Sequence, residues 1–134
     1  MFPNKPLSVI HHISLPATNL ERSSAFYDAV LATLGHQRIV NEPTVIGYGF
    51  IDNGDIFSLR LRSKEQIMTG DGFHIAFMAS TRSAVDAFHQ AAMAHGGKDN
   101  GGYGLHPEYG ANYYAAFVFD PDGYRIEAVI CGRA

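Results

Sequence analysis

An internal repeat covers most of this sequence. The segment from His12 to Gly35 aligns without a gap with the segment from His74 to Gly97, and eight of the twenty-four positions are identical. Only about one or two identities are expected by chance, so similarity at a fixed offset indicates a duplicated structural unit. The identical pairs are His12/His74, Ile13/Ile75, Ala17/Ala79, Ala25/Ala87, Phe26/Phe88, Ala29/Ala91, Ala32/Ala94 and Gly35/Gly97.

The two halves have the same predicted order of elements. A short strand, residues 9–16 or 73–78, precedes a run whose apolar residues recur at helical spacing and which ends in glycine. Strand-like runs follow, and two polar turns, 52–55 and 120–123, join the last ones into hairpins. These runs are residues 38–40, 47–51 and 56–61 in the first half, and 113–119 and 124–130 in the second. The predicted fold class is therefore α+β, with one βαβββ repeat at about 8–62 and another at about 72–131.

Two segments lie outside this pattern. Residues 62–72 are polar and contain Gly70 and Gly72, which predicts a linker between the repeats. Residues 96–112 hold six glycines together with His106 and Tyr109, and are predicted to form a long loop. Loops of that length in compact domains often have a function, so this one is expected to lie near a binding site.

Composition limits the class of protein. With 134 residues, 46% of them hydrophobic, the chain is expected to form one domain, residues 1–134, with a modest core. A net charge of −3 without a dense Lys/Arg cluster argues against nucleic acid and anionic membranes as partners. No signal pattern or membrane-length apolar run is present, so a cytoplasmic location is expected. The single cysteine, Cys131, is predicted to be a small buried apolar residue.

Alternation along the last strand of each repeat predicts a polar face. Ser58 and Arg60 share one face of their strand, as Arg125 and Glu127 do, while the apolar residues between them point to the helices. Alignment of these strands places Glu127 where the first repeat has Ser58. A carboxylate on a cavity-lining face needs a cation or strong hydrogen-bond donors to offset its desolvation.

Three stretches resemble a known superfamily. HHISLPATNLERSSAFYDAVLATLG, FHIAFMA and DPDGYRIEAV are similar to the opening strand and helix, the second ligand strand and the closing hairpin of vicinal oxygen chelate proteins. This superfamily includes glyoxalase I, the extradiol dioxygenases and the bleomycin-resistance proteins, and the similarity covers nearly the whole chain. The resemblance implies that the two repeats form a curved mixed sheet, or half-barrel, and that the protein is a homodimer.

The resemblance also implies a metal site. The superfamily's ligand positions correspond to His12, His74 and Glu127, and Glu127 is then also the catalytic residue. Glyoxalase I has a fourth ligand, a glutamate, where this sequence has Ser58, which argues against a standard glyoxalase I. Two histidines and one carboxylate are typical of non-haem sites with open positions, so the expected cofactor is a divalent ion: Fe, Mn, Zn or Ni. Such an ion would bind a substrate through two adjacent oxygens.

Further residues are expected to contact a small-molecule substrate. They are Ser58, Arg60, Tyr48, His106, Tyr109, Tyr113 and Tyr114. Other interpretations stay open, because single histidines on strands are often core residues and tyrosines often only pack. A second alternative is an ion pair between Arg60 and Glu127. Such a pair would replace the metal, and the site would be a binding pocket without catalysis.

Three classes of function follow from these observations. The first is a metal-dependent enzyme, lyase-like or dioxygenase-like. The second is a metal-free protein that sequesters a small molecule, as the bleomycin-resistance proteins do. The third is a fosfomycin-type transferase, for which the sequence shows no clear thiol-binding or potassium-binding loop. The fold alone does not decide between them.

Overall fold

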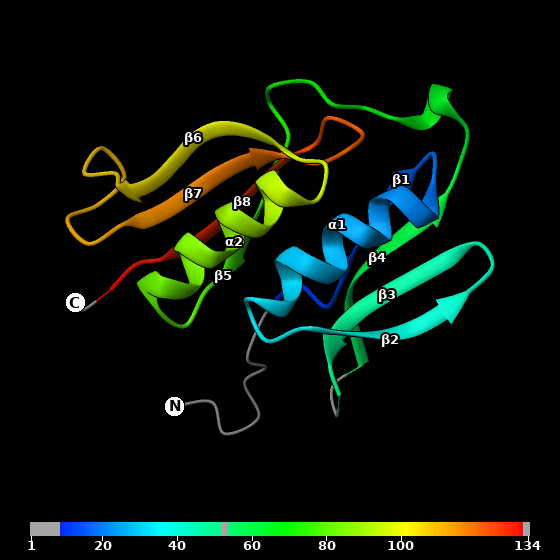
Figure 1. Cartoon of the computed structure of the whole chain (residues 1–134), viewed down its shortest axis with the longest axis horizontal. Helices are drawn as coiled ribbons and strands as arrows, with labels where there is room; N and C mark the ends of the chain where they lie inside the picture. The colour runs from blue at the N-terminus through cyan, green and yellow to red at the C-terminus, as the bar shows by residue number, and fades with distance from the viewer. Residues whose placement is uncertain (1–8, 52–53, 133–134) are drawn as a thin grey trace.

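The computed structural model describes residues 9–51 and 54–132. It contains two four-stranded mixed sheets, and a helix follows the first strand of each (Figure 1). The first repeat comprises β1 (Ile13–Ala17), α1 (Leu20–Ala32), β2 (Gln37–Glu42), β3 (Val45–Phe50) and β4 (Gly54–Leu61). The second comprises β5 (His74–Met78), α2 (Arg82–Ala94), β6 (Lys98–Leu105), β7 (Tyr114–Phe119) and β8 (Arg125–Ile130). The predicted βαβββ duplication is confirmed, and the predicted linker contains a short 3-10 helix, η1 (Lys64–Gln66).

Both sheets have the same topology. The strand orders are β1-β4-β3-β2 and β5-β8-β7-β6, with the first and last strands of each repeat parallel and the other pairs antiparallel. Ser58 lies opposite Ser14 on β1, and Glu127 lies opposite Ala76 on β5. Ser14 and Ala76 are equivalent positions in the aligned repeats. Ser58 and Glu127 therefore also occupy equivalent places, as the alignment of the two strands predicted. In both sheets the first strand of the repeat, β1 or β5, lies at one edge.

The helices begin at equivalent positions because each has a polar N-cap. The side chain of Asn19 accepts a hydrogen bond from the backbone N–H of Arg22 at 2.9 Å, and that of Thr81 accepts one from Ala84 at 3.0 Å. Each cap satisfies a backbone donor that has no partner within the helix. Neither helix in the described part of the chain is long and apolar enough to cross a membrane.

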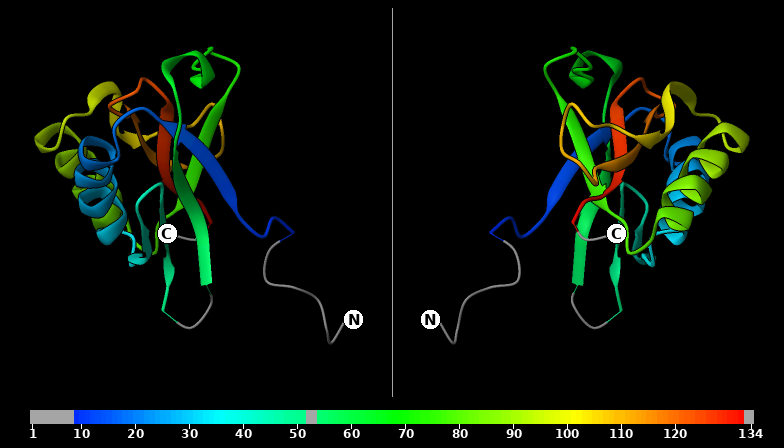
Figure 2. Two further views of the ribbon diagram at one scale, coloured as in Figure 1. Left: turned by 90° about the vertical axis from the view of Figure 1, so that its right-hand side faces the viewer. Right: turned by 90° about the vertical axis from the view of Figure 1, so that its left-hand side faces the viewer.

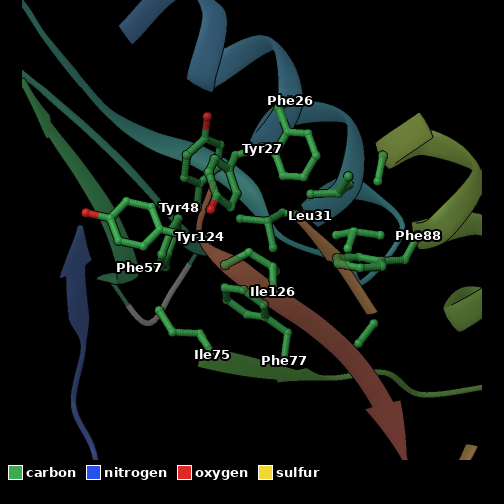
Figure 3. Packing of buried hydrophobic residues seen from close by; sticks show 14 of the residues in the cluster. Phe26, Tyr27, Leu31, Tyr48, Phe57, Ile75, Phe77, Phe88, Tyr124 and Ile126 are labelled. Carbon is green, nitrogen blue, oxygen red and sulfur yellow. The ribbon is translucent and has the colours of Figure 1, made fainter. Parts of the chain in front are cut away.

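The core lies between the two helices and the sheets. α1 and α2 pack side by side and form one layer, with the strands on their other side (Figures 1 and 2). Phe26 and Phe88, which are equivalent in the repeat, are both fully buried in a single cluster (Figure 3). Phe57 and Ile126 from the last strands join the same cluster. The two repeats therefore share one core.

A buried hydrogen-bond network also joins the repeats. The hydroxyl of Tyr27 on α1 donates to Asp120 Oδ2 at 2.7 Å, while the backbone N–H groups of Asp122 and Tyr124 donate to Oδ1 at 2.9 Å. Asp122 in turn accepts from the Thr18 hydroxyl at 2.8 Å. The turn between β7 and β8 is thus attached to the beginning of α1.

Several local predictions were wrong. The glycine-rich segment 96–112 is not one loop, because residues 98–105 form β6, which pairs with β7. The first strand begins at Ile13 rather than Val9, since its ladder with β4 starts where Ile13 lies opposite Phe57. Cys131 is exposed, because it follows the last residue of β8. Part of the predicted turn at 52–55 lies outside the described residues, whereas the turn at 120–123 is closed by a hydrogen bond between Gly123 N–H and the Asp120 carbonyl.

Candidate metal and substrate site

Glu127 is a buried carboxylate on the face of the second sheet that is turned away from the helices. Its strand, β8, lies between β5 and β7. Glu127 is opposite Ala76 on β5 and opposite Phe117 on β7. The flanking residues Ile126 and Ala128 point into the core, so alternation directs Glu127 to the opposite face. Glu127 is only 2% exposed. An ionised carboxylate at such a position needs donors or a cation.

Tyr113 and His74 are the partners of this carboxylate. The Tyr113 hydroxyl donates a hydrogen bond to Oε2 at 2.5 Å, and Nε2 of His74 lies 3.5 Å from Oε1. Burial, and then the hydrogen bond to Glu127, raise the pKa of Tyr113 well above its usual range. Tyr113 is therefore a protonated donor throughout the physiological range. The two carboxylate oxygens have different partners, a phenol on one and an imidazole on the other.

The carboxylate opens into a cavity of about 370 Å³. Aromatic rings form one wall: Tyr109 lies 5.2 Å from Tyr113 and 6.5 Å from Phe117 between ring centroids. The residues that line the cavity are His74, Asn100, Tyr109, Tyr113, Phe117, Arg125, Ile126 and Glu127. Polar groups thus converge at one place in an otherwise apolar hollow, as is usual for small-molecule sites.

Comparison with known proteins decides the family. A model of the Glyoxalase/Bleomycin resistance protein/Dioxygenase superfamily matches residues 9–128. The chain belongs to this superfamily.

Solved structures support the same conclusion. A glyoxalase/bleomycin resistance protein from Albidiferax ferrireducens T118 is 32% identical, with a TM-score of 0.80 over 91% of this chain and 98% of that one. The fold also matches a glyoxalase-related enzyme from Fulvimarina pelagi, at 21% identity and a TM-score of 0.68 over 92% and 88% of the two chains. A glyoxalase/bleomycin resistance protein/dioxygenase family enzyme from Burkholderia phytofirmans PsJN has the same fold at 18% identity. Its TM-score is 0.69 over 91% of this chain and 98% of that one. A search of curated proteins gave no match.

The superfamily's third ligand position, His12, is not beside the other two in this chain. His12 lies just before β1, exposed, with its Nδ1 atom 2.8 Å from that of His11. Among the described residues, no group of three or more His, Cys, Asp or Glu side chains could hold a metal. His12, His74 and Glu127 therefore do not meet at one centre within a chain.

Ser58 and Arg60 lie on the first sheet. The Ser58 hydroxyl is 2.7 Å from that of Ser14, and Arg60 Nε donates to the Ser14 hydroxyl at 3.4 Å. Ser58 is buried to 1% exposure, so the hydroxyl pair satisfies what would otherwise be an unpaired polar group. In this structure Arg60 interacts with Ser14 and not with Glu127, which leaves the carboxylate available.

The four remaining predicted residues divide between the two sides of the sheets. His106 and Tyr109 lie on the cavity side, where the His106 ring packs 4.9 Å from Phe117. Tyr48 and Tyr114 do not line this cavity, because their hydroxyls donate to carboxylates on the helices, Asp28 at 2.8 Å and Asp86 at 2.6 Å. Burial and the Asp28 hydrogen bond raise the pKa of Tyr48, while the Asp86 hydrogen bond and burial raise that of Tyr114 to about 12.

Two polar residues of the cavity were not among the predicted substrate contacts. Arg125 is two residues before Glu127 on β8, so strand alternation alone was sufficient to place it on the same face. Asn100 lies on β6 at an irregularity, where the register with β7 shifts between Asp99 and Gly102. Such bulges redirect side chains and are common beside functional sites, but the glycine-rich sequence concealed the strand.

Proposed function

We propose that this protein is a divalent-metal-dependent enzyme that acts on a small substrate with two adjacent oxygens. The observation that carries this proposal is the buried Glu127 carboxylate, which faces a cavity together with His74. In the proposed site His74 and Glu127 of one chain bind the metal with His12 of a second chain. Fe, Mn, Zn and Ni all accept such a set of nitrogen and oxygen donors.

The residues of the cavity fit a metal ion chemically. Glu127 Oε1 and His74 Nε2 are 3.5 Å apart, so a small movement would let both contact one ion. Tyr113 holds the other carboxylate oxygen, Oε2, so Oε1 is the oxygen that would hold an ion. An ion here would also compensate the buried negative charge.

The chemistry divides between the ion and the chain. When bound, a divalent ion would polarise the two substrate oxygens and stabilise the negative charge that develops on them. In this proposal Glu127 would accept a proton from the substrate, since its carboxylate lines the cavity. Tyr113, which keeps its own proton, orients that carboxylate.

A second copy of the chain is proposed to complete the site. β1 and β5 are edge strands of their sheets, with His12 directly before β1 and His74 as the first residue of β5. Apolar side chains on and before β5 are exposed, including Met78 at 85% and Met68 at 77%. Exposed apolar residues beside an open strand edge favour association with another chain.

The aromatic wall supports one alternative function. Tyr109 and Tyr113 would also suit a metal-free protein that sequesters a small aromatic molecule. The sequence resembles the bleomycin-resistance proteins, which sequester a small molecule without a metal. A fosfomycin-type transferase has no comparable support among the described residues.

Metal content decides between these functions. We expect wild-type protein, purified without chelators and offered divalent metals, to hold about one ion per chain. His74→Ala and Glu127→Ala should each lose most of it, whereas Glu108→Ala, an exposed glutamate, should retain it. If the folded wild type takes up no metal, the enzyme proposal fails and the sequestration function is favoured.

A further inference from the structure

The cavity beside Glu127 has an aromatic wall built from two elements. Tyr109 and Tyr113 belong to the segment that joins β6 to β7, and Phe117 lies on β7 itself. The Tyr109 and Tyr113 rings are inclined at 52°, and Tyr109 is 63% exposed. Aromatic rings at such angles and distances offer both faces and edges to an incoming ring. The wall is therefore suited to a flat, unsaturated compound.

Arg125 also lines this cavity. Arg125 Nη1 donates to the Thr69 carbonyl at 3.1 Å, and its Cζ atom lies 5.3 Å from the centre of the Phe119 ring. These two contacts hold the guanidinium group in place, but they use only a fraction of its five N–H donors. No carboxylate within residues 9–51 and 54–132 forms an ion pair with Arg125. Its positive charge is therefore available to an anionic ligand.

The positions of these groups determine how a ligand would lie. Glu127 repels an anion placed beside it, so the negative group of a ligand is directed to Arg125. Asn100 adds one amide that can donate or accept. A volume of about 370 Å³ is near the lower limit for small-molecule sites, which favours one ring over a fused system.

We propose that this cavity selects single-ring aromatic compounds that carry an anionic group, with the ring on the tyrosine wall and the anion on Arg125. This inference rests on the proposed function in one respect, that the cavity beside Glu127 is the substrate pocket. It adds the chemical class of the substrate. A guanidinium binds a carboxylate through two parallel hydrogen bonds, so a carboxylate is the preferred anion.

Three probes of similar size test the proposal directly. Benzoate has both the ring and the charge, cyclohexanecarboxylate has the charge without the aromatic ring, and benzyl alcohol has the ring without the charge. We expect benzoate to bind at least about tenfold more tightly than either of the others, measured by calorimetry or ligand-observed NMR. Comparable affinity for all three, or no detectable binding of benzoate, would overturn the proposal.

Two variants assign the selectivity to residues. Arg125→Gln should abolish the preference for benzoate over benzyl alcohol, and Tyr109→Leu should abolish the preference for benzoate over cyclohexanecarboxylate. Arg62→Gln is the matched control, because this exposed arginine does not line the cavity. Circular dichroism must first show that each variant is folded. Selectivity that is unchanged in a folded Arg125→Gln protein contradicts the assignment.

Measurement with and without metal separates this proposal from the proposed function. Benzoate selectivity in protein that takes up no metal would support the aromatic-anion site and reject the metal-dependent enzyme. Metal uptake without benzoate selectivity would support the metal-dependent enzyme and reject the aromatic-anion site.

Discussion

At the scale of single residues, the two repeats differ at the position that is Ser58 in the first sheet and Glu127 in the second. Ser58 and Glu127 occupy equivalent positions, yet Ser58 is paired with the Ser14 hydroxyl while Glu127 faces a cavity. The sequence was sufficient to predict this equivalence, because the repeat sets the alignment and strand alternation sets the face. It was not sufficient to predict Tyr113 as the partner of Glu127. That hydrogen bond depends on the path of the segment before β7, which no local pattern encodes.

Tyr113 is expected to tune metal binding through Glu127. Removal of its hydroxyl in Tyr113→Phe leaves Oε2 of a buried carboxylate without its donor, and the carboxylate loses its fixed orientation. We expect metal affinity to fall by about 10-fold to 100-fold, as is typical for groups that orient a ligand. Competition with a chromogenic chelator measures the change. Tyr103→Phe, at a half-exposed tyrosine outside the cavity, is the control, and equal affinities in the two variants would contradict this role.

At the scale of elements, local sequence predicted the helices better than the strands. The apolar spacing of both helices is a property of neighbouring residues, and α1 and α2 lie between the first strand and the glycine of each repeat, as it predicted. β6 was missed because its glycines favour loops. Its backbone is held by antiparallel pairing with β7, the next strand along the chain. Tertiary pairing thus overrode a weak local preference.

The glycine shared by the two repeats has different functions after the two helices. Gly35 has a φ of +89°, whereas in the second repeat the left-handed residue is Gly96, with a φ of +93°. Gly97 is required for a different reason. A Cβ there would lie 2.6 Å from Phe26 Cε1 and 2.9 Å from the carbonyl oxygens of Ala92 and Phe119.

Alanine at these glycines should therefore have unequal effects. We expect Gly97→Ala to reduce the free energy of unfolding by about 3 kcal/mol through overpacking between the repeats. Gly96→Ala should cost about 1 kcal/mol, the strain of a left-handed alanine. Urea denaturation of both variants measures the difference. An equal loss would show that the close approach at Gly97 relaxes easily.

At the scale of the whole molecule, the sequence predicted two similar halves but not how they are combined. The family resemblance implied one metal site formed by His12, His74 and Glu127, but within one chain α1 and α2 pack together and His12 is separate from the other two. A repeat pattern specifies equivalent positions within each half. It does not specify which copy of the other half, in the same chain or in a second one, faces them.

Mixed assemblies test whether two chains share the site. His12→Ala and Glu127→Ala should each bind little metal alone, but co-refolding them in equal amounts should restore about a quarter of wild-type metal content. The reason is that about half of randomly formed dimers are mixed, and each of these has one intact site of two. Mixing His74→Ala with Glu127→Ala should restore none, because both residues belong to the same half-site. Recovery in neither mixture would exclude the shared site.

The Tyr27–Asp120 hydrogen bond has a consequence for how this duplicated chain can evolve. It joins a helix of the first repeat to a turn of the second, and both partners are buried. A gene fragment that encoded only one repeat would leave either the phenol or the carboxylate unsatisfied and expose half of the shared core. We therefore expect that neither repeat of this chain folds on its own. Recombination that divides this gene at the linker should yield insoluble halves, whereas recombination that exchanges the whole gene preserves the fold.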